Sequence, residues 1–213
     1  MLLNGLVSNP IVFFAQAVAL IVGITVHEFS HALAARAQGD PTPQLQGRLS
    51  LNPLKHLDPL GTIFLLVAGF GWGRPVQFDP RYLNNPRIGS VIVGLAGPAA
   101  NLLLVVVFGV LLRVLALSGA ITPESGVFVL FSALLLMNLV LLIFNLIPIP
   151  PLDGSKLLLA LLPVSARGFS VWLQRYGTFL LFGLLIADAL APFSVLGWIF
   201  QTLINFTVSL AFG

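Results

Sequence analysis

The 213-residue sequence contains no cysteine, few charges and few residues that can bind a metal. Without cysteine neither a disulfide nor a thiolate metal site can form, so a metal would need nitrogen and oxygen ligands. Charged residues make up 8% of the chain, hydrophobic residues make up 58%, and the mean hydropathy is +1.03. This composition excludes an ordinary soluble domain and is typical of a polytopic membrane protein.

The small excess of positive charge reports membrane topology. The net charge is +3, but the basic residues lie in short loops between apolar runs, so we expect the lipid bilayer as a partner and no nucleic acid. The N-terminus has no basic stretch before its first apolar run, and that run continues into His27. We therefore expect a retained helix, not a cleaved signal peptide.

The apolar runs predict an all-α polytopic membrane protein with about six transmembrane or re-entrant helices. Asn9-Pro10 and Gly39-Asp40-Pro41 are typical start and stop signals for the first helix. The run at residues 60–70 is shorter than the ~20 residues of a full crossing, so we expect it to dip into the membrane and return. The five full spans are expected at residues 11–38, 88–117, 127–147, 177–190 and 195–212, with a further short apolar run at 157–162.

The loop around residues 60–70 completes the expected topology. Alternating residues at 45–51 and 75–79 predict a small β element on either side of the short run. If that run only dips in, nine of the ten basic residues lie on one side and Arg113 lies near the other. The positive-inside rule makes the first side the cytoplasm, so we expect a multi-pass protein of the cell membrane whose first helix ends there.

A metal-binding pattern lies within this first helix, at His27-Glu28-Phe29-Ser30-His31. Residues four apart share a helix face, so His27 and His31 can present two imidazoles to one metal with Glu28 beside them. Ionisable groups are costly at membrane depth and are usually found there for chemistry. We therefore expect the cytoplasmic half of the helix to carry a zinc site.

Catalytic zinc usually takes three protein ligands, so a third is needed. Asp153 follows a proline-rich break in an apolar stretch, which is typical of a membrane-embedded pocket. The alternative is that Asp153 caps the helix that follows it. The need for a third ligand favours the metal site over the cap. His56, the remaining histidine, is a weaker candidate because it lies in a proline-bounded loop.

Four motifs, at residues 27–31, 52–61, 96–101 and 145–154, together resemble the site-2 protease family of intramembrane zinc metalloproteases, peptidase family M50. The resemblance implies one Zn²⁺ per chain on His27, His31 and Asp153, with Glu28 as the catalytic base. It also implies that Asn101, alone or with Asn145, positions the substrate or binds the oxyanion. The implied substrates are transmembrane proteins, cleaved within or near their membrane helices in regulated intramembrane proteolysis.

The same resemblance implies a minimal family member without PDZ or CBS domains. We expect one membrane-embedded domain over residues 1–213, with a catalytic core at 11–163 and accessory helices at 171–213. The short strands could hold an unwound substrate by strand addition. Three alternatives remain at this point: a metal-binding membrane transporter, a catalytically inactive relative, and a prenyl-protein-type zinc protease. The last needs a glutamate ligand, and its one candidate, Glu124, is expected on the opposite membrane face.

Overall fold

The computed structural model describes residues 9–61 and 73–212, and these residues fold almost entirely as helices. The long helices of the first two thirds are α2 (Pro10–Ala37), α5 (Pro86–Leu117) and α6 (Gly126–Asn145). The others are α7 (Gly154–Leu161), α8 (Arg167–Leu190) and α9 (Val195–Phe212). Short helical turns lie at α3 (Thr42–Leu45), η1 (Pro53–Lys55), η2 (Pro80–Tyr82) and η3 (Val164–Ala166).

Each long helix of the bundle begins where a polar side chain caps it. The Asn9 side chain accepts a hydrogen bond from the Val12 N–H, and Pro10 occupies the first turn of α2. Asn85 and Ser125 cap α5 and α6 in the same way. Such caps satisfy backbone donors that would otherwise lack partners. The predicted start and end of the first helix, at residues 11 and 38, therefore lie within one residue of the observed bounds.

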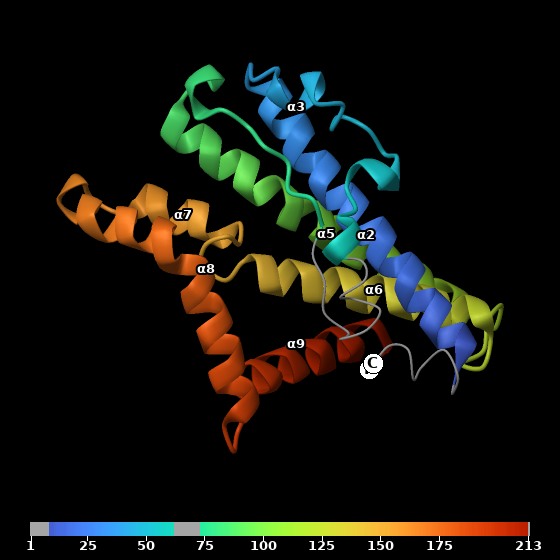
Figure 1. Cartoon of the computed structure of the whole chain (residues 1–213). Coiled ribbons are helices and arrows are strands. Elements are labelled where there is room, and N and C mark those ends of the chain that lie inside the picture. The colour runs from blue at the N-terminus through green and yellow to red at the C-terminus, as the bar shows by residue number, and fades with distance from the viewer. Residues whose placement is uncertain (1–8, 62–72, 213) are drawn as a thin grey trace.

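Helices α2, α5 and α6 pack against one another and form the centre of the molecule (Figure 1). Small residues allow the close approach of α2 to α6, where Ala15 and Ala19 contact Ala133 and Leu134. Close packing of small side chains is the usual means by which membrane helices associate. Helices α8 and α9 form a V beside α6 in Figure 1.

Four helices in the described part of the chain are long and apolar enough to cross a membrane: α2, α5, α6 and the stretch Val164–Leu190. Their outward faces carry large apolar side chains that are exposed in the isolated chain, such as Leu103 at 63% and Phe179 at 76%. Water would not tolerate so many exposed apolar groups, whereas lipid solvates them. The arrangement supports a multi-pass membrane protein.

The prediction of two short strands is wrong. Residues 42–45 form α3, and the chain then turns at Gly47, whose φ is +67°. Residues 75–79 are extended, but side-chain carboxylates occupy two of their donors: Glu28 accepts from the Val76 N–H and Asp40 from the Asp79 N–H. In the described residues the only pairing of β type is an isolated bridge between Leu57 and Gly73.

Helix α5 continues through Pro98, within the span predicted at 88–117. One other expectation needs correction. Helix α8 begins at Arg167, ten residues before the predicted span at 177–190, because Arg167, Gln174 and Arg175 lower the hydropathy of its first turns without interrupting the helix. The short run at 60–70 is predicted to dip into the membrane, and its residues from 62 onward lie outside the described part of the chain.

Candidate metal centre

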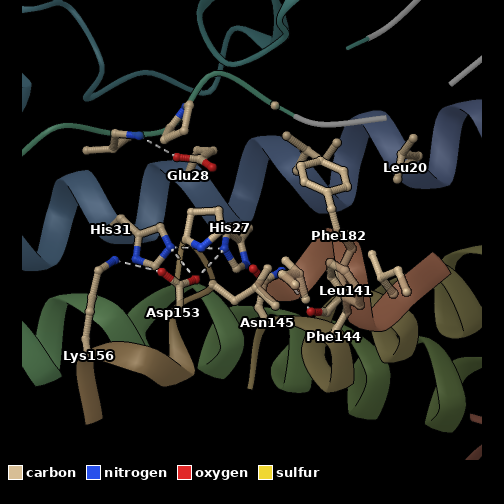
Figure 2. Close-up of a pocket in the computed structure, with 18 residues that line it drawn as sticks. Leu20, His27, Glu28, His31, Leu141, Phe144, Asn145, Asp153, Lys156 and Phe182 are labelled. Atoms are coloured by element: carbon tan, nitrogen blue, oxygen red, sulfur yellow. Dashed lines mark hydrogen bonds and ion pairs between the residues drawn. The ribbon is translucent and has the colours of Figure 1, made fainter. Parts of the chain in front are cut away.

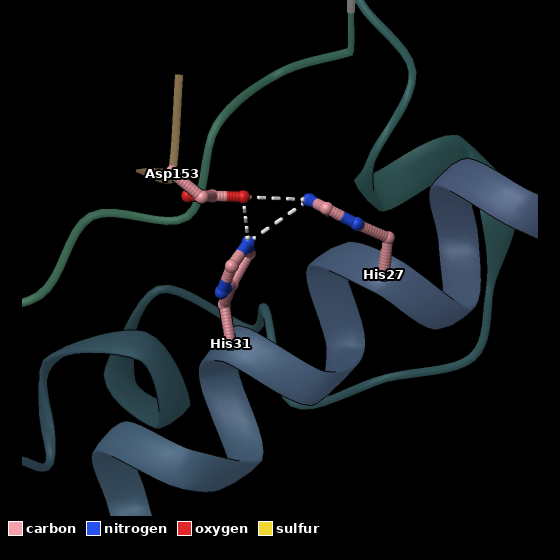
Figure 3. Close-up of side chains that lie close together, drawn as sticks. All are labelled: His27, His31 and Asp153. Atoms are coloured by element: carbon pink, nitrogen blue, oxygen red, sulfur yellow. Dashed lines mark hydrogen bonds and ion pairs between the residues drawn. The ribbon is translucent and has the colours of Figure 1, made fainter. Parts of the chain in front are cut away.

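Three side chains from α2 and the start of α7 converge on one point (Figure 3). The Nε2 atoms of His27 and His31 lie 3.0 Å apart, and each lies 3.0 Å from Oδ2 of Asp153. All three residues are buried, with exposed fractions of 6%, 5% and 6% respectively. At about 1.5 Å per residue, His27 lies roughly 15 Å from the C-terminal end of α2, well within a membrane-spanning length.

The far nitrogen of each histidine is bound to an oxygen of α5. Nδ1 of His31 lies 2.6 Å from the Val93 carbonyl oxygen, which can only accept, so this nitrogen carries the proton. Nδ1 of His27 lies 2.6 Å from Oδ1 of Asn101. Partners of this kind fix the tautomer and the ring orientation of metal-binding histidines. Both rings thus direct Nε2 to the shared point.

A relay of two amides fixes which atom of Asn101 faces His27. The Asn138 side-chain nitrogen donates to the Leu134 carbonyl at 2.7 Å, which leaves the Asn138 oxygen to accept from the Asn101 nitrogen at 2.8 Å. The Asn101 nitrogen also faces the Gly23 carbonyl at 3.4 Å. Both asparagines are fully buried. The Asn101 oxygen is therefore directed at His27, whose Nδ1 must donate to it.

These proton positions leave three lone pairs directed at one another. In neutral imidazoles protonated at Nδ1, both Nε2 atoms are acceptors, and they face a carboxylate oxygen at 3.0 Å. Three acceptors in buried contact repel one another unless a cation lies between them. Ligands about 2.0–2.1 Å from a tetrahedral zinc are about 3.3 Å apart, so the residues fit zinc after a shift of about 0.3 Å.

Gly97 makes room for this cluster in the facing helix α5. A Cβ atom at position 97 would lie 2.5 Å from Nε2 of His31 and 2.6 Å from Nε2 of His27. Cβ atoms essentially never make contacts under 3.0 Å, so no other residue fits here without displacing the rings. The absence of a side chain at this position brings α5 close enough for Val93 and Asn101 to bind the two imidazoles.

Asp153 does not act as a helix cap. It occupies the cap position of α7, but its side chain makes no hydrogen bond to the backbone of that helix. Instead Oδ2 faces the histidines, and Oδ1 accepts a hydrogen bond from Lys156 at 2.8 Å. The structure therefore contradicts the capping alternative and places the carboxylate beside the imidazoles.

Glu28 lies beside the cluster but faces the other way. Its Oε2 accepts a hydrogen bond from the Val76 N–H at 2.8 Å, and Figure 2 shows the carboxylate directed toward the extended segment above α2. Glu28 lines the same cavity as His27, His31 and Asp153. A change of its side-chain torsions is therefore needed to direct the carboxylate at the point where the three ligand atoms meet.

The cavity has a volume of about 610 Å³ and is mostly apolar away from the cluster (Figure 2). Helix α6 contributes Leu141, Phe144 and Asn145 to its wall, and α8 contributes Phe182 among others. A few polar groups within a mostly apolar cavity are typical of a binding or active site.

The remaining candidates lie elsewhere. His56 is fully buried in the loop after α3, where its Nε2 lies 2.6 Å from the Ser50 carbonyl oxygen. Glu124 is exposed in the turn between α5 and α6, about 30 Å of helix beyond Gly97. Sequence reasoning missed Asn138, Lys156 and the need for glycine at 97. A lone amide within the apolar run of α6 was the one available signal for Asn138.

Comparison with known proteins identifies the protein family to which this chain belongs. The sequence profile of peptidase family M50 matches residues 15–120 and 114–186. The chain belongs to this family. It is 41% identical over 179 residues to YwhC of Bacillus subtilis, provisionally named a zinc metalloprotease, covering 83% of this chain and 81% of the relative. No solved structure matches the chain.

Two further relatives carry the same provisional zinc metalloprotease name. Rip2 of Mycolicibacterium smegmatis is 33% identical over 200 residues, covering 89% of this chain and 74% of the relative. MJ0611 of Methanocaldococcus jannaschii is 31% identical over 153 residues, covering 70% and 71%. Membership of family M50 confirms the resemblance and the predicted class of zinc metalloprotease.

Proposed function

We propose that this chain is an intramembrane zinc metalloprotease that hydrolyses peptide bonds within or near the transmembrane helices of other proteins. In this proposal His27, His31 and Asp153 hold one Zn²⁺ per chain and Glu28 is the catalytic base. The observation that carries it is the convergence of three buried acceptor atoms at 3.0 Å, each held by a second contact. Such an arrangement needs a cation, and its donor set suits zinc.

The chain's own residues then divide the work of peptide hydrolysis. Zinc in such a site supplies a Lewis acid that activates water for attack on a carbonyl. Glu28 leaves the Val76 N–H, accepts a proton from the attacking water and delivers it to the nitrogen of the leaving amine. The apolar cavity limits the access of bulk water, which strengthens the electrostatic interactions in the site.

The two asparagines suit different roles. Asn101 uses its oxygen on His27 and its nitrogen on Asn138 and Gly23, so we propose that it holds the His27 ring in place. Asn145 lines the cavity, and its nitrogen donates one hydrogen bond to the Leu141 carbonyl. Its second N–H has no partner among the described residues and can donate to a substrate carbonyl or an oxyanion. Asn145 is thus the better candidate for direct substrate contact.

A transmembrane substrate fits the surroundings of the site. The cavity is walled by apolar residues of α2, α6 and α8, which match the side chains of a membrane helix. A helical substrate hides its carbonyls in backbone hydrogen bonds, so it must unwind locally before attack. Gly, Pro or polar residues in the substrate helix would make that unwinding less costly.

We also propose that the metal centre faces the cytoplasmic half of the membrane, with residues 1–213 forming one domain. The end of α2, the start of α5, and α7 lie toward one end of the bundle in Figure 1, and the α5–α6 turn lies at the other. In the topology expected from the sequence, nine of the ten basic residues lie on the cytoplasmic side and Arg113 lies near the other, which supports this orientation. The core at 11–163 holds every proposed ligand, and α8 adds Leu181, Phe182 and Leu185 to the cavity wall.

The test is cleavage of a panel of single-span substrates by the purified chain in liposomes. We expect wild type to cleave and Glu28→Gln to lose at least about 100-fold in rate while keeping its zinc, because only the base is changed. The control is Glu124→Gln, the same chemical change at an exposed glutamate in the turn between α5 and α6. Cleavage by Glu28→Gln at the wild-type rate would contradict the proposal. A metal transporter would lose no function in Glu28→Gln, so metal uptake in the same liposomes separates the two functions.

A further inference from the structure

Lys156 binds the oxygen of Asp153 that the histidines leave free. Its Nζ lies 2.8 Å from Oδ1, while Oδ2 of the same carboxylate lies 3.0 Å from each imidazole. The two oxygens of Asp153 therefore have separate partners, an ammonium on one and the metal-binding point on the other. Figure 2 shows Lys156 reaching Asp153 from the side opposite His27.

The lysine is held more firmly than a surface ion pair three residues apart on a helix. Its side chain is 29% exposed, and its stem lies against Gly94 of α5, where a Cβ atom would come within 2.6 Å of its Cδ. Its Nζ also lies 5.5 Å from the centre of the Phe78 ring. Exposed ion pairs contribute little to protein stability because both side chains move freely. Contacts from α5 and from the segment after residue 73 restrict that freedom here.

We propose that Lys156 is a positioning residue that makes Asp153 bind the metal through one oxygen only. This inference rests on the proposed zinc site and assigns to it a residue outside the ligand set. A carboxylate with both oxygens free can bind a metal through either or both of them. Catalytic zinc uses three protein ligands and keeps a fourth position for water or substrate. By occupying Oδ1, Lys156 keeps Asp153 from adding a second oxygen ligand beside that fourth position.

The test uses Co²⁺ as a spectroscopic substitute for Zn²⁺ in the full-length chain purified in detergent. The visible absorption of Co²⁺ weakens as its coordination number rises above four. We expect Lys156→Met, saturated with Co²⁺, to lose a large part of the wild-type absorption intensity because both carboxylate oxygens become ligands. We also expect its zinc affinity to change by about 10-fold, as is usual when an outer partner of a ligand is removed. Lys156→Arg should restore the spectrum, because it retains a charged donor.

The chain offers a matched control in its other lysine. Lys55 is exposed and does not line the cavity, so Lys55→Met should leave the spectrum and the affinity unchanged. If Lys156→Met does not fold, Gly94→Ala displaces the lysine stem with a residue that favours helix, and it should weaken the Co²⁺ absorption in the same way. Wild-type spectra in both variants would overturn the inference. Failure of wild type itself to bind Co²⁺ or Zn²⁺ would instead overturn the proposed metal site.

Discussion

Gly97→Ala tests the claim that the close approach of α5 organises the metal centre. The added Cβ would lie 2.5 Å from Nε2 of His31, whereas ordinary contacts begin at 3.4 Å, so about 0.9 Å of separation must be created. The imidazoles cannot simply turn away, because Val93 and Asn101 hold their far nitrogens at 2.6 Å. If α5 retreats instead, it carries both of these acceptors with it. Either movement disrupts the geometry of the ligands.

The magnitude follows from the size of that displacement. A misplacement of about 1 Å at a reacting centre costs on the order of 100-fold in rate. Loss of the outer hydrogen bonds of metal ligands costs about 10–100-fold in metal affinity. Alanine is intrinsically more favourable than glycine in a helix by about 1 kcal/mol, so the helix propensity of α5 improves. We therefore expect a folded protein with about 10–100-fold lower zinc affinity and about 100-fold slower cleavage.

The assay compares Gly97→Ala with Gly109→Ala in the same helix. At position 109 the new Cβ would lie 3.3 Å from Cδ1 of Leu135, the far end of a flexible side chain, so that variant should behave as wild type. Zinc affinity is measured by competition with a chromophoric chelator, rate by cleavage of a single-span substrate, and folding by thermal unfolding of the metal-free protein. The reasoning is refuted if Gly97→Ala binds zinc and cleaves as Gly109→Ala does.

Two further predictions concern the residues around the ligands. Asn138→Leu removes the acceptor that orients the Asn101 amide, so we expect zinc affinity to fall about 10-fold. The control is Asn205→Leu, at an exposed position. Equal zinc affinities of the two variants in chelator competition would contradict the proposed role of the Asn138–Asn101 hydrogen bond. Val76→Pro removes the N–H that holds Glu28. Hydrogen bonds to charged groups are worth about 1.5–3 kcal/mol, so we expect kcat to change by about 10-fold or more while the zinc content stays the same. An unaltered kcat would show that this contact does not influence the base.

The helices of the bundle and the proposed ligands could be predicted because the sequence marks them locally. Asn9-Pro10 carries a cap and a first-turn proline, and the observed helix begins there. The spacing of His27 and His31 requires only the geometry of one helix turn. Asp153 was reached by counting zinc ligands, although its partner helix lies more than a hundred residues away. The structure brings these three residues together, and their metal-binding role remains a prediction.

The rest depended on tertiary contacts that local patterns do not encode. The extended residues 75–79 look like a strand, but the carboxylates of Glu28 and Asp40 take donors that a neighbouring strand would otherwise use. Nothing in the sequence near Gly97 reveals that two imidazoles lie against it. Asn138 and Lys156 likewise gain their roles from neighbours on other helices or turns. The proposed ligands could therefore be predicted from the sequence, whereas the residues that surround and hold them could be identified only in the three-dimensional structure.

The central claim is that His27, His31 and Asp153 together hold one zinc ion. Elemental analysis of the purified chain, equilibrated with trace zinc and then desalted, measures this directly. We expect about one zinc per wild-type chain, about one in the control Asp79→Ala, and less than about a tenth in Asp153→Ala. A full zinc ion retained by Asp153→Ala, or no zinc in the folded wild type, would contradict the account.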